Sequence, residues 1–380
     1  MEEEAAVALN PASIPAILAA NVAAHSGEII LRKKDRGIWK AVTWGELSTR
    51  VREVSSGLTK MGFRPGDVAC VLAETRPEWV YVDLGILTAA GVAAGVLPES
   101  DAEQLGQVLR DSHCRVLFVE NEEQLDKTLL IRDSCPALQR IVIIDMKGLR
   151  DFTDPMCISL KAFAGSGSEA TAVAVTAEQP AVLLLRDGSL QTLSHGETMS
   201  LIADARTKLP VRPNDERLAL LPMSEVMERV LGLYLSLEAR VISNYLENPD
   251  TVVENLQELQ PTVLATDARI WQVLRDRIEA AAANATHLQR MLYRCAIAAA
   301  AHRGPVAWLA RATVLRAVSR EIGLGRLRIA YAGGPRLSPE SERWTAALGI
   351  NIRHIDGKAT QGISLDEQRY QALKEAAYGT

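Results

Sequence analysis

Residues Val68–Val92 read "VACVLAETRPEWVYVDLGILTAAGV", and this stretch indicates the fold class. Its first five residues are apolar and predict a buried strand, and Pro77 stands where the first turn of a helix favours proline. Two more strands are predicted at Arg115–Glu120 and Arg140–Asp145, with a charged helical segment between them. Such alternation predicts an α/β fold with a largely parallel sheet covered by helices on both faces.

The second half of the chain repeats this alternation after a small, polar segment. That segment, residues 164–180, reads "AGSGSEATAVAVTAEQP" and is predicted to be a linker. Further strands are predicted at Leu218–Pro222, Thr262–Thr266 and Leu327–Gly334, with a long helical stretch at Ala268–Ile322. The predicted division is a first α/β subdomain at 1–163, the linker at 164–180, a second α/β subdomain at 181–365 and a helical tail at 366–380.

Composition places the chain among ordinary globular proteins and argues against several partners. Hydrophobic residues make up 48% and charged residues 23%, and the net charge is −5. This balance does not favour nucleic acid or an anionic membrane as the main partner. No secretory signal and no membrane-spanning segment are expected, and the five scattered cysteines favour a reducing cytoplasm over a disulfide or zinc framework.

The stretch "AVLLLRDGSLQTLSHGETMS", residues 181–200, raises the question of a phosphate site. It reads as a strand, a sharp turn at "RDGS" and a helix, and helix N-termini bind anions. The turn nevertheless has a single glycine and no lysine, and Asp187 is acidic. Ser194 is predicted to cap the helix with Glu197 as the supporting acid, because Ser194 and His195 are adjacent and cannot face each other on a helix.

Five segments in the same order carry a resemblance over nearly the whole chain. They are residues 32–100, 122–155, 221–241 ("LPMSEVMERVLGLYLSLEARV"), 260–278 and 328–352 ("RIAYAGGPRLSPESERWTAALGINI"). With these segments the chain resembles the adenylate-forming (AMP-binding) superfamily, and most closely the long-chain acyl-CoA synthetases. The resemblance implies stacked, mostly parallel sheets with flanking helices, as in the large N-terminal domain of those enzymes, and ATP-dependent activation of a carboxylate for transfer to CoA.

The motifs that hold the nucleotide in such enzymes are degenerate here. The family's phosphate loop reads Thr-Ser-Gly-Thr-Thr-Gly-x-Pro-Lys-Gly, whereas this chain has "RDGSLQ", residues 186–191, roughly five residues shorter. In the family's Gly-Tyr-Gly-x-Thr-Glu motif, Asp356 falls at the adenine-stacking tyrosine and Thr360 at the magnesium-binding glutamate. The resemblance also implies that the mobile C-terminal lid is absent, since the chain ends at Thr380.

The predicted degenerate nucleotide cleft holds eleven residues. They are Arg186, Asp187, Gly188, Ser189, Glu225, Gly333, Gly334, Pro335, Asp356, Gly357 and Thr360. Glu225 stands where the family often has histidine or another aromatic residue, which makes this corner of the cleft more acidic. We expect no catalytic residue, no metal ligand and no cofactor among them.

These losses predict a non-catalytic homologue, a pseudoenzyme. Its expected role is a regulatory or stabilising subunit for an active acyl-CoA synthetase or a related enzyme, or a homo-oligomer. Two alternatives stay open: a sensor that binds an acyl chain or acyl-CoA, and an enzyme of altered chemistry in which Asp187, Glu225, His354 and Asp356 converge. "AGGPRLSPE" has a structural interpretation too, with Ser338 capping the next helix.

Overall fold

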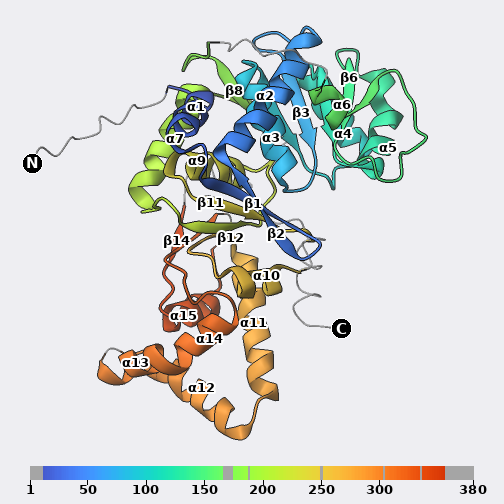
Figure 1. Cartoon of the computed structure of the whole chain (residues 1–380). Helices are drawn as coiled ribbons and strands as arrows, with labels where there is room; N and C mark the ends of the chain where they lie inside the picture. The colour runs from blue at the N-terminus through green and yellow to red at the C-terminus, as the bar shows by residue number, and fades with distance from the viewer. Residues whose placement is uncertain are drawn as a thin grey trace, which may run out of the picture. The chain divides into compact units, whose positions relative to one another are not determined.

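The computed structural model describes residues 12–165, 174–186, 189–248, 251–302, 304–333 and 336–355 (Figure 1). The chain divides into two compact units. Unit 1 comprises Met1–Glu28, Thr43–Glu74 and Glu78–Asp204, and unit 2 comprises Ile29–Val42, Thr75–Pro77 and Ala205–Thr380. The four-part division predicted from the sequence stays a prediction.

Unit 1 is built on a seven-stranded sheet in the order β7-β6-β5-β3-β4-β8-β9. Every neighbouring pair is parallel except β8 and β9, which are antiparallel. The strands are β3 (Val68–Leu72), β4 (Val92–Val96), β5 (Val116–Val119), β6 (Arg140–Ile143), β7 (Cys157–Ser159), β8 (Pro180–Arg186) and β9 (Ser189–Ser194). The predicted strands at 68–72, 115–120 and 140–145 are confirmed.

Helices cover the sheet of unit 1, and their packing forms its core. They are α1 (Ile14–His25), α2 (Trp44–Lys60), α3 (Pro77–Thr88), α4 (Ala102–Asp111), α5 (Glu122–Ile131), η1 (Arg132–Ser134), α6 (Leu160–Ala164) and α7 (His195–Lys208). Because β5 is buried along its whole length, all four of its residues are apolar. Trp44 and Trp79, predicted core residues, are buried.

Unit 2 holds a second seven-stranded sheet, in the order β14-β13-β12-β10-β11-β1-β2. The pairs from β14 through β1 are parallel, and β1 joins the sheet across a long stretch of chain, with Leu31 opposite Ser243. The strands are β1 (Ile29–Asp35), β2 (Ile38–Thr43), β10 (Glu216–Ala219), β11 (Ile242–Tyr245), β12 (Val263–Asp267), β13 (Ile329–Gly333) and β14 (Ile352–His354). The predicted α/β fold with largely parallel sheets is therefore confirmed.

The helical stretch predicted at Ala268–Ile322 is a series of shorter helices. Thr286 starts a new helix with a capping box, and Gly304 precedes the next helix with φ +137°, a conformation that favours glycine. The helices of unit 2 are α8 (Val226–Glu228), η2 (Arg229–Tyr234), α9 (Leu235–Ala239), α10 (Val252–Leu259), α11 (Ala268–Asn284), α12 (His287–Ala300), α13 (Pro305–Ala310), η4 (Arg311–Leu315), α14 (Arg316–Glu321) and α15 (Pro339–Ala347).

The five cysteines are free, as their scattered spacing predicts. Cys70, Cys114 and Cys135 are buried, Cys157 is half-buried and Cys295 is exposed. Burial raises the pKa of the Cys157 thiol to about 11, so this thiol stays protonated at neutral pH. No helix among the described residues is both long enough and apolar enough to cross a bilayer.

Candidate functional site

The β8–β9 pair occupies the place where the sequence predicts a degenerate phosphate loop. The strands pair in continuous register from Val182 opposite Leu193 to Arg186 opposite Ser189. Asp187 and Gly188 lie outside the described residues, as does the side chain of Arg186. Ser189, the first residue of β9, is exposed. Only residues 187 and 188 therefore separate the two strands in the sequence.

The prediction that a helix follows this turn directly is wrong. Residues Ser189–Ser194 form β9, and α7 begins only at His195. Leu190 of β9 packs against the hydrophobic core of unit 1, which holds the strand on the sheet. In sequence terms, an Asp-Gly pair between two strand-forming runs is a strong signal for a two-residue hairpin, and the pairing of the flanking strands β8 and β9 agrees with it.

The helix start that the sequence predicts at Ser194 is confirmed. The Ser194 hydroxyl accepts a hydrogen bond from the Glu197 N–H at 3.1 Å, and the Glu197 carboxylate accepts one from the Ser194 N–H at 2.7 Å. These two bonds form a capping box, which satisfies two donors that a helix end leaves free. Ser194 is thus engaged in structure and is not a nucleophile.

His195 is a buried core residue. Its Nδ1 accepts a hydrogen bond from the backbone N–H of Ile14 at 3.4 Å, which ties α1 to the start of α7 within unit 1. Burial lowers the pKa of His195 to about 4. The imidazole is therefore neutral at physiological pH and supports the fold.

A second group of predicted residues lies at the carboxyl edge of the unit 2 sheet. In parallel sheets, ligands bind beyond this edge. Asp267 ends β12 and Gly333 ends β13, and the two residues are opposite each other in the ladder. Glu225 stands at the start of α8, in the segment that leaves β10. This placement brings Glu225 and Gly333 of the predicted cleft to one edge of one sheet.

Glu225 has an unusual electrostatic setting. Burial, together with the nearby Asp267 carboxylate, raises the pKa of Glu225 to about 7. Asp267 is fully buried and caps α11 by accepting a hydrogen bond from the Arg269 N–H at 2.7 Å. Glu225 can therefore take up or release a proton near neutral pH.

Two hydroxyl residues precede these two acidic residues in the sequence. Ser224 precedes Glu225, and Thr266 precedes Asp267 on a fully buried strand. Among the described residues neither Oγ has a hydrogen-bond partner. Both oxygens are buried, and Thr266 points to the opposite face of the sheet from Asp267, so the described group that this edge offers to a polar ligand is the protonatable Glu225 carboxyl.

The remaining predicted residues of this edge are not described. Gly334, Pro335, Asp356, Gly357 and Thr360 lie outside the described residues. Of the acid/base group proposed for altered chemistry, the structure describes Glu225 and His354, the last residue of β14, and leaves Asp187 and Asp356 outside. Ser338 caps α15 as predicted, since its hydroxyl accepts a hydrogen bond from the Ser341 N–H at 3.2 Å.

Sequence reasoning missed a buried ion pair below this edge. Arg217 of β10 binds Glu228 of α8, and both side chains are at most 1% exposed. Arg217 also donates to the Ser243 hydroxyl at 3.3 Å, and the Leu221 N–H donates to Glu228 at 3.4 Å. Arg217 directly precedes the strand predicted at Leu218–Pro222, whereas β10 begins earlier, at Glu216, and so includes it; a charged residue in a buried strand is unusual, because such strands are otherwise apolar.

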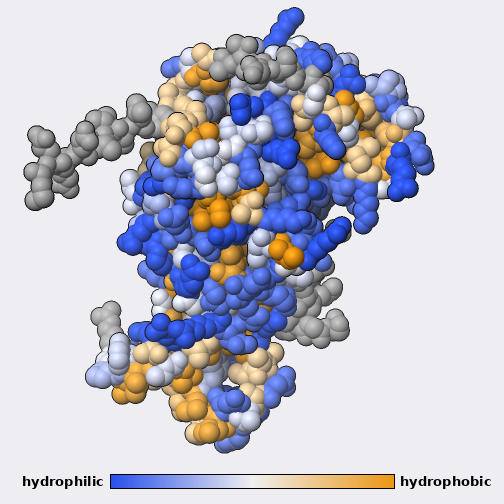
Figure 2. All heavy atoms as spheres, in the orientation of Figure 1, coloured by the Kyte–Doolittle hydropathy of each residue, from blue (hydrophilic) through white to orange (hydrophobic). Residues whose placement is uncertain are grey.

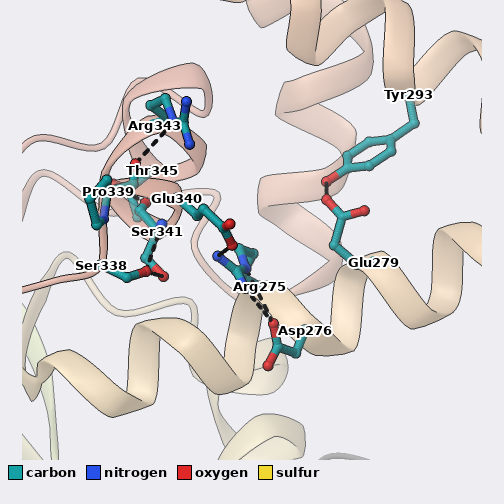
Figure 3. Close-up of polar contacts among 10 residues, drawn as sticks. All are labelled: Arg275, Asp276, Glu279, Tyr293, Ser338, Pro339, Glu340, Ser341, Arg343 and Thr345. Atoms are coloured by element: carbon teal, nitrogen blue, oxygen red, sulfur yellow. Dashed lines mark hydrogen bonds and ion pairs between the residues drawn. The ribbon is translucent and has the colours of Figure 1, made fainter.

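A pocket of about 810 Å³ lies between α11, α12 and α15. Figure 3 shows that several polar side chains in this pocket and next to it pair with one another. Arg275 binds Asp276 and Glu340, each at 3.0 Å, and the Tyr293 hydroxyl donates to Glu279 at 2.8 Å. None of the predicted cleft residues lines this pocket, so it is separate from the site at the sheet edge.

The chemistry open to the described residues is limited. Among them, no group of three or more histidine, cysteine or acidic side chains could hold a metal ion. The groups at the sheet edge can exchange a proton and form hydrogen bonds. Such groups suffice to bind a polar ligand or to transfer a proton.

Comparison with known proteins gives matches over most of the chain. The profile of a family described as AMP-binding enzyme matches residues 18–357. The long-chain-fatty-acid–CoA ligase FadD15 of Mycobacterium bovis is 26% identical over 374 residues, which cover 92% of this chain and 61% of that protein. The long-chain-fatty-acid–CoA ligase ACSBG2 of Rattus norvegicus is 24% identical, with coverages of 91% and 56%.

Solved structures show the same fold. The anthranilate CoA ligase AuaEII, crystallised with anthranoyl-AMP, matches with a TM-score of 0.68 at 18% identity, over 90% of this chain and 58% of that one. The A-PCP didomain of the carboxylic acid reductase from Segniliparus rugosus matches with a TM-score of 0.72 at 15% identity, with coverages of 90% and 51%. The chain thus spans between about half and 61% of the length of these proteins.

Proposed function

Since the chain belongs to the AMP-binding enzyme family, and its curated relatives are named long-chain-fatty-acid–CoA ligases, we propose that it is a non-catalytic member of that family. In this proposal the protein acts in the cytoplasm as a regulatory or stabilising subunit of an enzyme of acyl-CoA metabolism. It keeps the scaffold of an acyl-CoA synthetase and works by binding.

One observation carries the proposal: Arg186 and Ser189 are paired neighbours in the β8–β9 ladder. Only two residues separate them, whereas the family loop supplies several hydroxyl, glycine and lysine donors at this place. A triphosphate needs such donors and positive charge around it. Two residues, one of them the acidic Asp187, cannot replace them.

The charges at the carboxyl edge of the unit 2 sheet support the same conclusion. Glu225 and Asp267 interact closely enough for Asp267 to help raise the pKa of Glu225. A phosphate group placed there would add negative charge to two carboxyl groups in a partly dry setting, which is unfavourable. By sequence, Asp356 and Thr360 replace the adenine-stacking and magnesium-binding residues of the family motif.

The rate consequence is large. Removing one donor that stabilises transition-state charge lowers a rate by about 10² to 10³. Groups that act as a unit do not give multiplicative losses. The loop and the magnesium ligand nevertheless differ together, and Arg269, a described cation at the sheet edge, is already paired with Asp267 at 3.8 Å.

The experiment is a titration calorimetry measurement of ATP with magnesium, with and without a fatty acid, together with an ATP–pyrophosphate exchange assay. The Mycobacterium bovis FadD15 ligase, measured under the same conditions, is the positive control. We expect no saturable heat and no exchange from this chain. Saturable micromolar binding, or exchange at a rate near that of FadD15, would refute the loss of catalysis.

The subunit role has its own test. The chain is co-expressed with an acyl-CoA synthetase from the same source, and the lysate is resolved by size-exclusion chromatography. Co-elution and a rise in the partner's melting temperature are expected, because a partner that binds only the folded state stabilises it. Separate elution at every concentration would contradict a subunit role even if ATP binding is absent.

The protonatable Glu225 carboxyl group at the sheet edge favours a second candidate, an acyl or acyl-CoA sensor. Below pH 7 Glu225 carries a proton and can donate to the carboxyl or carbonyl oxygen of a ligand. Thermal shift with a panel of fatty acids and acyl-CoAs tests this candidate. Glu225→Gln should retain a hydrogen-bond donor and much of the shift, whereas Glu225→Ala should lose it; a silent panel would exclude the candidate.

A further inference from the structure

Helices α12 and α13 expose an unusual number of large apolar side chains. On α12 they are Leu288, Met291 and Leu292, and on α13 they are Val306, Trp308 and Leu309. Val306 is 70% and Trp308 is 69% exposed. Figure 2 shows apolar residues gathered over these two helices, which Figure 1 places at the end of the helical layer of unit 2, away from its sheet. We call these six residues the apolar face.

The apolar face extends the packed side of α12 toward the start of the helix, since Leu292 and buried Ala296 are four residues apart. Leu288, Met291 and Leu292 have the i, i+3, i+4 spacing that puts them on one side of a helix. The buried residues Ala296 and Ala300 belong to a small core with Leu315 and Ala347. Helix α12 therefore already has its packing partners, and the exposed stripe is an additional apolar surface.

None of the six residues lines the pocket between α12 and α15. They project outward from two helices that pack against each other. A surface of this kind does not enclose a small molecule, which needs a concave site. It suits an extended partner that accepts protruding side chains.

The charge around the apolar face is one-sided. Residues 285–320 contain six arginines and no aspartate or glutamate, while the whole chain has a net charge of −5. Arg294 on α12 and Arg316 on α14 are exposed. The segment therefore carries a local charge of +6 in an otherwise acidic protein, and its partner should be anionic.

We infer that the apolar face and its arginines dock on an anionic lipid surface, with the α12–α13 pair lying in the headgroup region. Amphipathic helices of this type combine Trp and Leu on one side with basic residues. The buried apolar area and the attraction of the basic residues to anionic lipids both strengthen membrane binding. A second copy of the chain fits less well, because the same arginines would face each other across the contact. An acidic protein would need to cover an outward-projecting tryptophan, whereas a lipid interface accepts tryptophan readily.

Co-sedimentation with vesicles tests the inference. Wild-type protein should bind vesicles of phosphatidylcholine with phosphatidylglycerol, bind phosphatidylcholine alone far less, and dissociate as salt rises. Arg294→Glu/Arg316→Glu should weaken binding by roughly 30-fold or more, since each basic residue near such a surface contributes about a factor of five. Leu130→Ser, at a 79% exposed leucine of α5, is the matched control and should bind as wild type.

Tryptophan fluorescence gives a second, independent readout. Trp308 is the exposed one among the six tryptophans; Trp39 is half-buried, and the other four are buried. Brominated lipids should therefore quench wild-type protein, and Trp308→Phe should lose the quenching while it keeps the sedimentation. The double variant Trp308→Ser/Leu309→Ser should lose vesicle binding while its melting temperature stays that of the wild type.

Three outcomes would overturn the inference. One is equal binding to neutral and anionic vesicles, and another is quenching that persists in Trp308→Phe. The third is no vesicle binding, combined with a dimer in light scattering that Trp308→Ser/Leu309→Ser dissociates, which would assign the apolar face to a second copy. Because none of these readouts involves ATP, they are independent of the proposed loss of catalysis.

Discussion

Substitution of Arg217 by methionine should strongly destabilise unit 2. Arg217 and Glu228 form an ion pair with both side chains at most 1% exposed. Methionine has a similar volume, but it leaves the Glu228 carboxylate buried with the Leu221 N–H as a long hydrogen-bond donor at 3.4 Å. Breaking a buried ion pair by removing one partner lowers the free energy of unfolding by about 3–5 kcal/mol.

The expected change in melting temperature follows from the size of the unit. A domain of this size loses roughly 2–4 °C per kcal/mol. Arg217→Met should therefore lower the melting temperature of unit 2 by about 6–20 °C. The double variant Arg217→Met/Glu228→Leu removes both charges, and a well-packed apolar replacement of a buried pair is often neutral or stabilising. The double variant should melt near wild type.

Differential scanning calorimetry measures these shifts, and amide hydrogen exchange of β10 assigns the transition to unit 2. Arg50→Met, which removes an exposed ion pair with Glu53 in unit 1, is the control and should change little. The reasoning fails if Arg217→Met shifts melting no more than the control. It also fails if the double variant is as unstable as the single one.

Three further predictions rest on single contacts, and urea unfolding at several pH values measures them. The pKa of buried His195 is lowered to about 4, so native stability should be intact above pH 6.5 and fall by about 3 kcal/mol as the pH drops toward 4; His195→Gln should remove this step. The pKa of Glu225 is raised to about 7, so the free energy of unfolding should fall as the pH rises from 4.5 to 7. At pH 8 Glu225→Gln should be more stable than the wild type by on the order of 2 kcal/mol. Equal free energies of unfolding for the two proteins at every pH would contradict the coupling to Asp267. Ser194→Ala should lower stability by about 1 kcal/mol through loss of the cap on α7, whereas Ser200→Ala, at an exposed position of the same helix, should not.

Local features of the fold could be predicted from the sequence. The strand at Val68–Leu72, the helix that begins at Pro77 and the cap at Ser194 each depend on neighbouring residues, so short windows reveal them. The prediction of a helix directly after residues 186–189 was wrong because two local signals competed in this stretch of sequence. The sequence pair Asp-Gly favours a hairpin, β8 and β9 on either side of it pair antiparallel, and the helix start lies one strand later.

The site could be predicted only in part because its contacts are non-local. Glu225 and Asp267 come from different strand ends, and no sequence window shows that their charges interact. The Arg217–Glu228 pair is closer in sequence, at 11 residues, but it forms only because β10 and α8 pack together and bury both side chains. Net charge also misleads: a value of −5 for the chain hides a segment in which all six charged side chains, from Arg290 to Arg320, are positive.

The pairing of β1 with β11 has a consequence for biosynthesis. Leu31 and Ser243 are 212 residues apart, so β1 leaves the ribosome long before its partner exists. At about 5–20 residues per second the delay is roughly 10–40 s. During that time β1 presents an unpaired edge to other nascent chains. We expect chaperone dependence and aggregation of truncated products to depend on this strand. A fragment that starts at Ala205 should lack two strands of its sheet, β1 and β2, however well the rest folds.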